Sequence, residues 1–268
     1  MVETVCEWFD RGNFRGIKGV LKLINNRYFM YCQTPKLKNV IGISTLLSDY
    51  YASRGCNTVY IPTLVDPEEY KGVEHTEQGG PLRIAYAGSP GRKDYIGNVI
   101  RAIALLSDNE REKICLDLYG ATEEQVVALG IERSFLEQNR HCVVCHGRIP
   151  YKDVKGKIAD ADFTVLLRPD KRYANAGFPT KVGESMACGT PVIANHTSNL
   201  DRYILDGKTG VVCKDETPQA CLDALRRAIA LTPEERKQMR SAAFEMAQSA
   251  FSFKEYVNDT ADFLKKVK

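Results

Sequence analysis

The feature that most constrains the fold is a strand–loop–helix–strand pattern at residues 164–194, TVLLRPDKRYANAGFPTKVGESMACGTPVIA. The loop at 168–179 contains two prolines, one glycine and three basic residues. A helix over 181–188 follows, with Thr180 as its predicted N-cap, and Gly-Thr-Pro ends it before the second strand. The first strand is an apolar run typical of parallel sheets covered on both faces, made of Val165, Leu166 and Leu167.

This pattern predicts a site for an anion. The loop ends at a helix N-terminus, where free backbone N–H groups favour negative charge. Glu184 lies one turn inside the helix, so a nucleotide could bind by its phosphate at the helix start and by its ribose hydroxyls at the carboxylate. An ordinary βαβ crossover with a surface glutamate fits the same pattern, and the pattern alone leaves both interpretations open.

Strand and helix patterns alternate along the chain, which predicts an α/β fold: a parallel sheet with helices on both faces. The length of 268 residues suits one large or two small domains. The polar segment 66–81, with two prolines and three glycines, predicts a linker. We therefore expect a partial α/β portion at 1–65, the main domain at 82–250 and a C-terminal helix at 251–268.

Composition narrows the class of protein. A net charge of +3 is too small to indicate a nucleic-acid partner, and we expect none. Nine cysteines without a framework spacing suit a reducing cytosol. The first ten residues carry acids where a signal peptide needs bases, and no apolar run approaches the ~18 residues of a membrane span. We expect a cytoplasmic protein.

Two cysteines and two histidines raise the question of zinc. Cys142 and Cys145 are flanked by His141 and His146 within a predicted strand. In a strand the two cysteines point to opposite faces, and no second ligand pair lies at a zinc-finger spacing. We predict a buried strand and no metal.

A basic amphipathic pattern occupies residues 11–22, inside a stretch with seven basic residues and no acid. Such a helix either lies on an anionic membrane surface or docks on the protein with a solvated basic face. One face carries Arg11, Arg15, Lys18 and Lys22, and the other carries Phe14, Ile17, Leu21, Ile24 and Tyr28.

Several glycine-containing or basic segments follow predicted strands. They are residues 88–93, Gly120, 147–149 and 168–184. Ligands of parallel sheets bind at the carboxyl ends of the strands, so these segments converge on one crevice. The 88–93 loop, GSPGRK, is a phosphate cradle by geometry but lacks the spacing of a P-loop.

The segments GSPGRKD, LYG, HGRIP, ADADFTVLLRP, NAGFPTKVGESMACGTPVI and LDGKTGVV occur in this order and resemble the C-terminal half of GT-B glycosyltransferases. The chain is similar to the large retaining group 1 (family 4), which includes sucrose synthase and many capsule and lipopolysaccharide transferases. Residues 41–65 resemble the end of that family's N-terminal domain. The resemblance implies a Rossmann-like nucleotide-sugar-binding domain at 82–250, after a truncated acceptor domain at 1–65.

The resemblance also implies roles for single residues. Lys93 matches the basic residue that binds the donor diphosphate, and Glu184 matches the second glutamate of the Glu-x7-Glu motif, which holds the ribose. The first glutamate is replaced by Ala176. The family's Gly-Arg pair is replaced by Gly88 and Ser89, so Arg92 or Arg168 supplies the missing cation.

Further positions follow from the same resemblance. Residues facing the sugar and phosphates, chiefly through backbone amides, would be Asn175, Gly177, Phe178 and Thr180, with Lys181 beside them. Arg148 and Ile149 would flank the base. The expected catalytic residues are Lys93, Arg168 and Glu184.

The implied reaction is transfer of a sugar from a UDP- or GDP-sugar to a glycan or lipid-linked acceptor, with retention, in polysaccharide, lipopolysaccharide or capsule biosynthesis. Lys93, an arginine and the helix start at Thr180 would stabilise the leaving diphosphate without a metal or cofactor, and no nucleophile is assigned. A hydrolase with two facing carboxylates is disfavoured, because the loop offers only Glu184. Alternatives are a GT-B epimerase or phosphorylase and a non-catalytic nucleotide-binding module.

The N-terminal portion is short for a self-standing domain, which usually needs about 100 residues. We therefore expect an incomplete glycosyltransferase that binds donor weakly and does not transfer sugar alone. In this hypothesis the helices at 11–31 and 253–268 pack together as remnants of the first domain.

Overall fold

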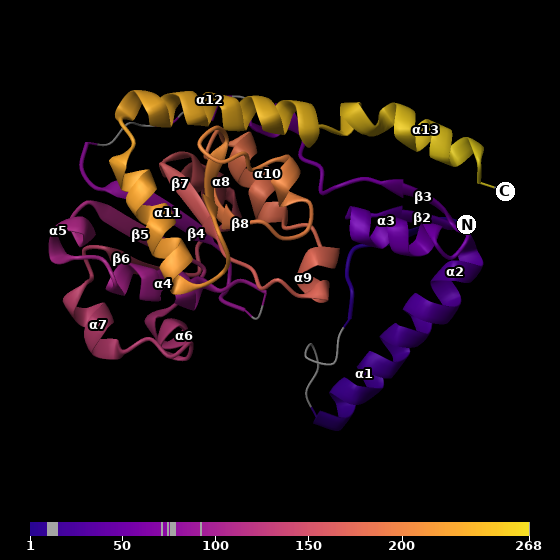
Figure 1. The fold of residues 1–268 in the computed structure, drawn as a ribbon, viewed down its shortest axis with the longest axis horizontal. Helices are drawn as coiled ribbons and strands as arrows, with labels where there is room; N and C mark the ends of the chain where they lie inside the picture. Colours follow the sequence, from indigo (N-terminus) through magenta and orange to yellow (C-terminus); the bar gives the residue numbers. More distant parts are fainter. Residues whose placement is uncertain (10–15, 71, 74, 76–78, 92, 268) are drawn as a thin grey trace.

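The computed structural model describes residues 1–9, 16–70, 72–73, 75, 79–91 and 93–267. Within these residues the chain forms two parallel sheets (Figure 1). All paired strands of the larger sheet run parallel, which confirms the predicted α/β fold class. Its six described strands have the order β6-β5-β4-β7-β8-β9, with bounds β4 Leu82–Ala87, β5 Ile114–Tyr119, β6 Val143–Gly147, β7 Phe163–Leu166, β8 Val192–Asn195 and β9 Gly210–Cys213.

Helices cover both faces of the six-stranded sheet. Side chains alternate between the two faces along each strand, so both faces carry apolar side chains that the helices bury. In β4, Ile84 and Tyr86 join one apolar core, and in β8, Val192 and Ala194 join the other. The first core includes residues of α4 (Ile96–Ala104), α6 (Glu123–Val127), α7 (Arg133–Gln138) and α11 (Pro218–Ala230). The second includes residues of α8 (Tyr151–Ala159), α10 (Thr180–Ala187) and α12 (Pro233–Ala250).

The smaller sheet has the order β1-β2-β3 and its own apolar core. Val40 and Leu47 are fully buried there, and the Trp8 ring packs edge-on against Tyr50 with centroids 4.8 Å apart. The elements are β1 (Glu3–Val5), α1 (Gly16–Tyr28), η2 (Phe29–Gln33), α2 (Thr34–Leu37), β2 (Asn39–Gly42), α3 (Thr45–Ala52) and β3 (Asn57–Tyr60).

Two segments far apart in sequence run side by side between the sheets. Val65 donates its N–H to the carbonyl of Phe251 over 2.9 Å and forms a parallel bridge with Ser252. After this point η5 (Phe253–Tyr256) and α13 (Val257–Lys265) lead to β3, where Asn57 donates to the carbonyl of Phe263 over 3.2 Å. The C-terminal segment therefore connects the two sheets a second time (Figure 1).

Some local expectations need correction. The segment 168–179 is not all loop, because it contains the short helix α9 (Arg172–Ala176). Helix α10 begins at Thr180, so Thr180 is its first residue and Pro179 is its N-cap. Figure 1 shows α1 and α13 apart, with β2, β3 and α3 between them, so the expectation that these two helices pack together is wrong. The remaining described short helices are η3 (Pro67–Tyr70), α5 (Asp108–Arg111) and η4 (Leu200–Arg202).

Helix α1 leaves most of its apolar side chains in solvent. Ile17 is 84% exposed and Leu21 is 62% exposed, whereas Leu23 is buried. Arg11, Phe14 and Arg15 of the predicted stripe lie outside the described residues. None of the helices in the described part of the chain is long and apolar enough to cross a lipid bilayer.

Candidate functional site

Three glycines form a row where neighbouring strands end. Gly88 follows β4 and donates its N–H to Tyr119 at the end of β5 over 2.7 Å. Gly120 then donates to Gly147 at the end of β6, also over 2.7 Å. A Cβ on Gly120 would lie 2.8 Å from the Gly88 carbonyl oxygen, and φ there is +98°, so only glycine fits this close approach. The row forms a rim of backbone along the ends of β4, β5 and β6.

A cavity of about 890 Å³ lies above this rim. Seven predicted residues from three separate segments line it together: Gly88, Ser89, Arg148, Ile149, Thr180, Lys181 and Glu184. The predicted convergence of strand ends is therefore present. Gly120, from the row of glycines, also lines the cavity. The other lining residues were not predicted as site residues: Ala87, Tyr119, Thr122, Gln125, Pro150, Tyr151 and Val154.

Glu184 is half-buried and lies on the second turn of α10. Among the described residues its carboxylate has no hydrogen-bond or ion-pair partner. The start of α10 has no side-chain cap, and Val182 donates its N–H to the Pro179 carbonyl over 3.1 Å, so the N–H groups that precede Val182 in the helix are those offered to an anion. Thr180 and Glu184 therefore present the helix N-terminus and a carboxylate to the same cavity.

Lys181 is held in a small charged cluster. Its ammonium forms an ion pair with Asp94 and donates to the Tyr86 hydroxyl over 3.2 Å. Tyr86 in turn donates to Asp94 over 3.0 Å. Burial, together with the charge of Asp94, holds the pKa of Tyr86 well above its ordinary value, so the hydroxyl stays protonated. Nothing in the sequence pattern indicated this partnership, which spans 87 residues.

Lys93 does not line the cavity in this conformation. Its ammonium forms an ion pair with Glu7, which follows β1 in the smaller sheet. Arg92, the other predicted cation of this loop, lies outside the described residues.

Arg168 lies beneath the α9 loop and is only 4% exposed. It donates from Nη1 to the Gly177 carbonyl over 3.2 Å, while its backbone N–H donates to Asn195. Its Nε has no hydrogen-bond partner within the described chain. Burial lowers the pKa of the guanidinium, and the nearby carboxylate of Asp94 partly opposes that shift. The side chain supports the loop and is not among those lining the cavity.

The side chains of Asn175 and Phe178, two further predicted site residues, contact other parts of the protein. Asn175 bridges two loops, because it donates to Asp170 over 2.7 Å and accepts from the Ser198 N–H over 2.8 Å. Phe178 is buried against Tyr203 and Phe251, which places its side chain in the core. The structure therefore does not bring the side chains of Asn175 and Phe178 to the cavity, and Gly177 is also absent from its lining.

Gly177 is the close neighbour of the N-terminal segment. A Cβ placed there would lie 3.4 Å from the Cys6 carbonyl oxygen. Ser44 also donates to the adjacent Ala176 carbonyl over 2.7 Å. This part of the loop therefore contacts the smaller sheet.

The histidines beside Cys142 and Cys145 pair with carboxylates. His146 lies 2.6 Å from Asp117, and His141 lies 3.5 Å from Glu112. Burial raises the pKa of both Cys142 and Cys145 to about 11. The described residues contain no group of three or more His, Cys, Asp or Glu side chains arranged to hold a metal ion.

Comparison with known proteins shows where this architecture recurs. Residues 69–246 match the family model described as "Glycosyl transferases group 1". Over 192 residues the chain is 19% identical to "Uncharacterized glycosyltransferase MJ1069" of Methanocaldococcus jannaschii. The match covers 69% of this chain and 47% of the relative, so this chain spans about half the length of the curated relative it matches.

Solved structures share the fold. The Anabaena protein Alr3699/HepE, solved in complex with UDP and glucose, superposes with a TM-score of 0.70 at 15% identity, covering 99% of this chain and 71% of that one. Sucrose-phosphate synthase from Thermosynechococcus elongatus gives a TM-score of 0.68 at 16% identity, covering 99% and 67%.

Proposed function

This chain belongs to the glycosyl transferases group 1, and we propose from that membership that its cavity binds a nucleoside diphosphate sugar as donor. The observation that carries the proposal is the pairing of Glu184 with the uncapped start of α10 in one cavity at the strand ends. The helix N-terminus suits the diphosphate, and the unpartnered carboxylate suits the two ribose hydroxyls.

The base and sugar are the next part of the proposal. We propose UDP or GDP as the nucleotide and a hexose as the sugar. The structural neighbour from Anabaena is solved with UDP and glucose, which supports this choice. Arg148 and Ile149 line the cavity, and a planar base would lie against these two side chains.

The proposed chemistry is electrostatic. As the bond between sugar and diphosphate breaks, negative charge grows on the leaving phosphate. The start of α10, Lys181, and Lys93 after release from Glu7 would stabilise that charge without a metal or cofactor. Arg168 would contribute from beneath the loop, since a buried charge acts over a longer distance than an exposed one.

We propose retention of configuration, with the acceptor attacking on the face from which the diphosphate leaves. A two-carboxylate mechanism would need a second acid facing Glu184, and none of the described residues that line the cavity supplies one. The acceptor is proposed to be a glycan or lipid-linked sugar of polysaccharide, lipopolysaccharide or capsule biosynthesis. The resemblance of the motif segments supports this assignment.

We further propose that the protein works in the cytoplasm, peripheral to an anionic membrane. The exposed apolar side chains of α1 support this, because they lie on the helix that also carries Lys18, Lys22 and Arg27. A helix with such a composition binds anionic lipid by burying apolar side chains beneath the headgroups.

The proposal is tested by titration calorimetry of the full chain with UDP, GDP and ADP, and then with their sugars. We expect one diphosphate to bind at a single site and its sugar to bind there too. Absence of binding by all three diphosphates would contradict the proposed function. Conversion of the bound sugar without an acceptor would instead favour an epimerase.

A further inference from the structure

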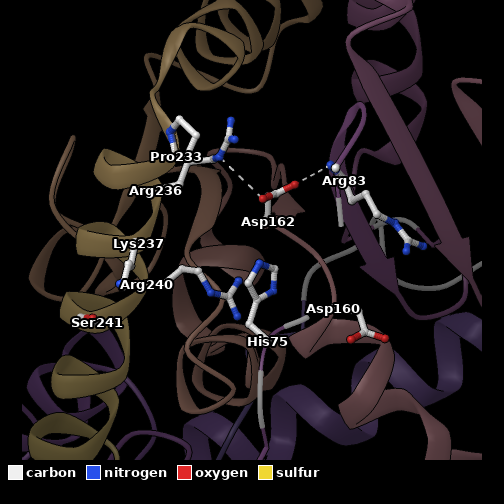
Figure 2. A pocket seen from close by; sticks show the side chains of 10 residues that line it. His75, Arg83, Asp160, Asp162, Pro233, Arg236, Lys237, Arg240 and Ser241 are labelled. Atoms are coloured by element: carbon white, nitrogen blue, oxygen red, sulfur yellow. Dashed lines mark hydrogen bonds and ion pairs between the residues drawn. The ribbon is translucent and has the colours of Figure 1, made fainter. Parts of the chain in front are cut away.

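A second cavity lies at the amino-terminal ends of the strands of the six-stranded sheet, opposite the candidate donor cavity. Its volume is about 720 Å³, and it is built where β4 and β7 begin (Figure 2). Arg83 is the second residue of β4, and Asp162 immediately precedes β7. A strand of six residues spans about 20 Å, so this cavity is separated from the candidate donor cavity by the length of β4. The donor site therefore does not explain it.

Cationic side chains dominate the wall that α12 contributes. Arg236, Lys237 and Arg240 line the cavity from the first two turns of this helix. Arg83 lines the strand side, but its guanidinium points away toward Asp117, with which it pairs at 2.9 Å (Figure 2). The cavity therefore receives three cations from α12 against the carboxylates of Asp160 and Asp162.

Among the described lining residues, the two carboxylates of Asp160 and Asp162 balance only two of these three positive charges. Asp162 accepts the Arg83 backbone N–H over 2.8 Å and lies 3.7 Å from Nε of Arg236, which is a loose ion pair. Lys237 is exposed and contacts no acid among the described residues. Because Lys237 lines the cavity and is exposed to solvent, a small anion can reach its ammonium.

Arg240 carries the most confined charge. Its guanidinium donates to the carbonyls of Ala161 over 2.7 Å and Ala159 over 3.0 Å, at the end of α8. It contacts no carboxylate directly in the described chain. Burial lowers the pKa of Arg240 to about 10, but the group remains positive at neutral pH. A half-buried cation bound only by backbone carbonyls gains free energy from an incoming anion.

His75 lies beside this guanidinium. Its Nδ1 donates to the Ala159 carbonyl over 2.9 Å, the same oxygen that accepts from Arg240. The bond fixes the ring against α8, where it lines the cavity (Figure 2). The imidazole is thereby a second oriented polar group next to Arg240.

We propose that this cavity binds a small phosphate-bearing anion through Arg236, Lys237 and Arg240. Arginine forks and a lysine ammonium are the side chains that recognise phosphate oxygens best, and the volume exceeds that of a single phosphate group. The ligand class is a phosphate ester or a diphosphate rather than a protein surface, because the cations line a hollow.

The test is titration calorimetry of the full chain with inorganic pyrophosphate and, separately, inorganic phosphate, in the presence of saturating UDP. UDP occupies the candidate donor site, so binding that persists belongs to a second site. Lys237→Gln removes a side chain with no described protein partner, and Arg236→Gln removes a loose ion pair with Asp162 and a hydrogen bond to the Leu231 carbonyl. Lys208→Gln is the matched control, an exposed lysine outside the cavity with the same change of charge.

We expect Lys237→Gln and Arg236→Gln each to weaken pyrophosphate about tenfold, the loss of a charged hydrogen bond, with no effect of Lys208→Gln and no change in UDP affinity. Equal losses in all three variants would mean general attraction to positive charge and would overturn the proposal. Complete competition by UDP, or no binding of either anion, would overturn it as well. Circular dichroism of each variant checks that the fold is retained.

Discussion

Glu7 and Lys93 form an ion pair that joins the segment after β1 to the loop after β4, across 86 residues of sequence. Both side chains are exposed by about two fifths, 46% for Glu7 and 39% for Lys93. Exposed pairs contribute about 0.2–1 kcal/mol, so this contact breaks readily. The residue expected to bind the donor diphosphate is therefore held aside by a weak internal competitor.

Glu7→Gln should tighten nucleoside diphosphate binding, because Lys93 no longer has to leave the Glu7 carboxylate in order to bind the diphosphate. The gain in affinity cannot exceed the free energy of the Glu7–Lys93 ion pair, which corresponds to about fivefold. Calorimetry with UDP or GDP measures it. Glu3→Gln, four residues earlier at the start of β1 and without a described ion pair to Lys93, is the control and should change nothing.

Lys93→Ala should weaken the same ligand by about 1.5–3 kcal/mol, the contribution of a charged hydrogen bond. An unchanged dissociation constant would show that Lys93 stays with Glu7 and does not reach the phosphates. The Lys208→Gln protein serves again as a control for loss of one positive charge.

Glu184→Gln should weaken ribonucleotides more than their 2′-deoxy analogues. The carboxylate accepts from two ribose hydroxyls, and the amide replaces one acceptor oxygen with a donor. Affinities of UDP and 2′-deoxy-UDP for wild type and variant give the difference. Glu245→Gln, at an exposed position on α12, controls for the change of charge. Equal losses for both nucleotides would show that Glu184 does not contact the ribose.

Gly88→Ala should impair nucleotide binding more than Gly91→Ala in the same loop. At Gly88, φ is +150° and a Cβ would lie 2.6 Å from Nζ of Lys181, so the ammonium must leave its place beside Asp94. At Gly91 a Cβ meets its nearest atom at 3.9 Å. The backbone strain costs about 1–3 kcal/mol and should appear in urea unfolding as well as in calorimetry. Similar behaviour of the two variants would contradict this account of the rim.

Phe251→Ala should lower the free energy of unfolding by about 3–5 kcal/mol, because the ring is fully buried against Phe178 and Tyr203. Phe244→Ala is the matched comparison: its ring is 39% exposed, and the cost should be below about 1 kcal/mol. Urea unfolding followed by circular dichroism measures both. A small effect at Phe251 would mean that the C-terminal segment is loosely attached.

Ile17→Ser combined with Leu21→Ser should reduce sedimentation with anionic vesicles, because these side chains are the exposed apolar part of α1. Leu105→Ser, at a 53% exposed position on the six-stranded part, is the control. Binding that does not depend on the anionic lipid content would contradict the proposed membrane contact.

The sheet was predictable because its signals are local. Each strand of the larger sheet is a short, mostly apolar segment, and Gly88, Gly120 and Gly147 mark three of the strand ends within the sequence itself. In a parallel sheet, strand ends meet at one edge, so the residues that follow them were expected together. Glu184 was also predictable, because helix periodicity sets its position one turn from the helix start.

The side-chain partners were not predictable in the same way. Lys181 with Asp94 and Lys93 with Glu7 are pairs between distant segments, and nothing in the local pattern selects one acid among many. Phe178 follows a glycine in a loop, where periodicity does not define which way a side chain points. The fold turns its ring into the core beside Phe251, which lies 73 residues further along the chain.

The doubled crossing at Val65 and Phe251 has a mechanical consequence. A single polypeptide connection between the two sheets would allow rotation about any axis. Here two connecting segments are joined by the Val65–Phe251 hydrogen bond and by the bridge from Val65 to Ser252. Two connections allow rotation about one axis only. We expect any rotation of the smaller sheet relative to the larger one to be restricted to this axis, and such a rotation would break the contacts of Ser44 with Ala176 and of Glu7 with Lys93.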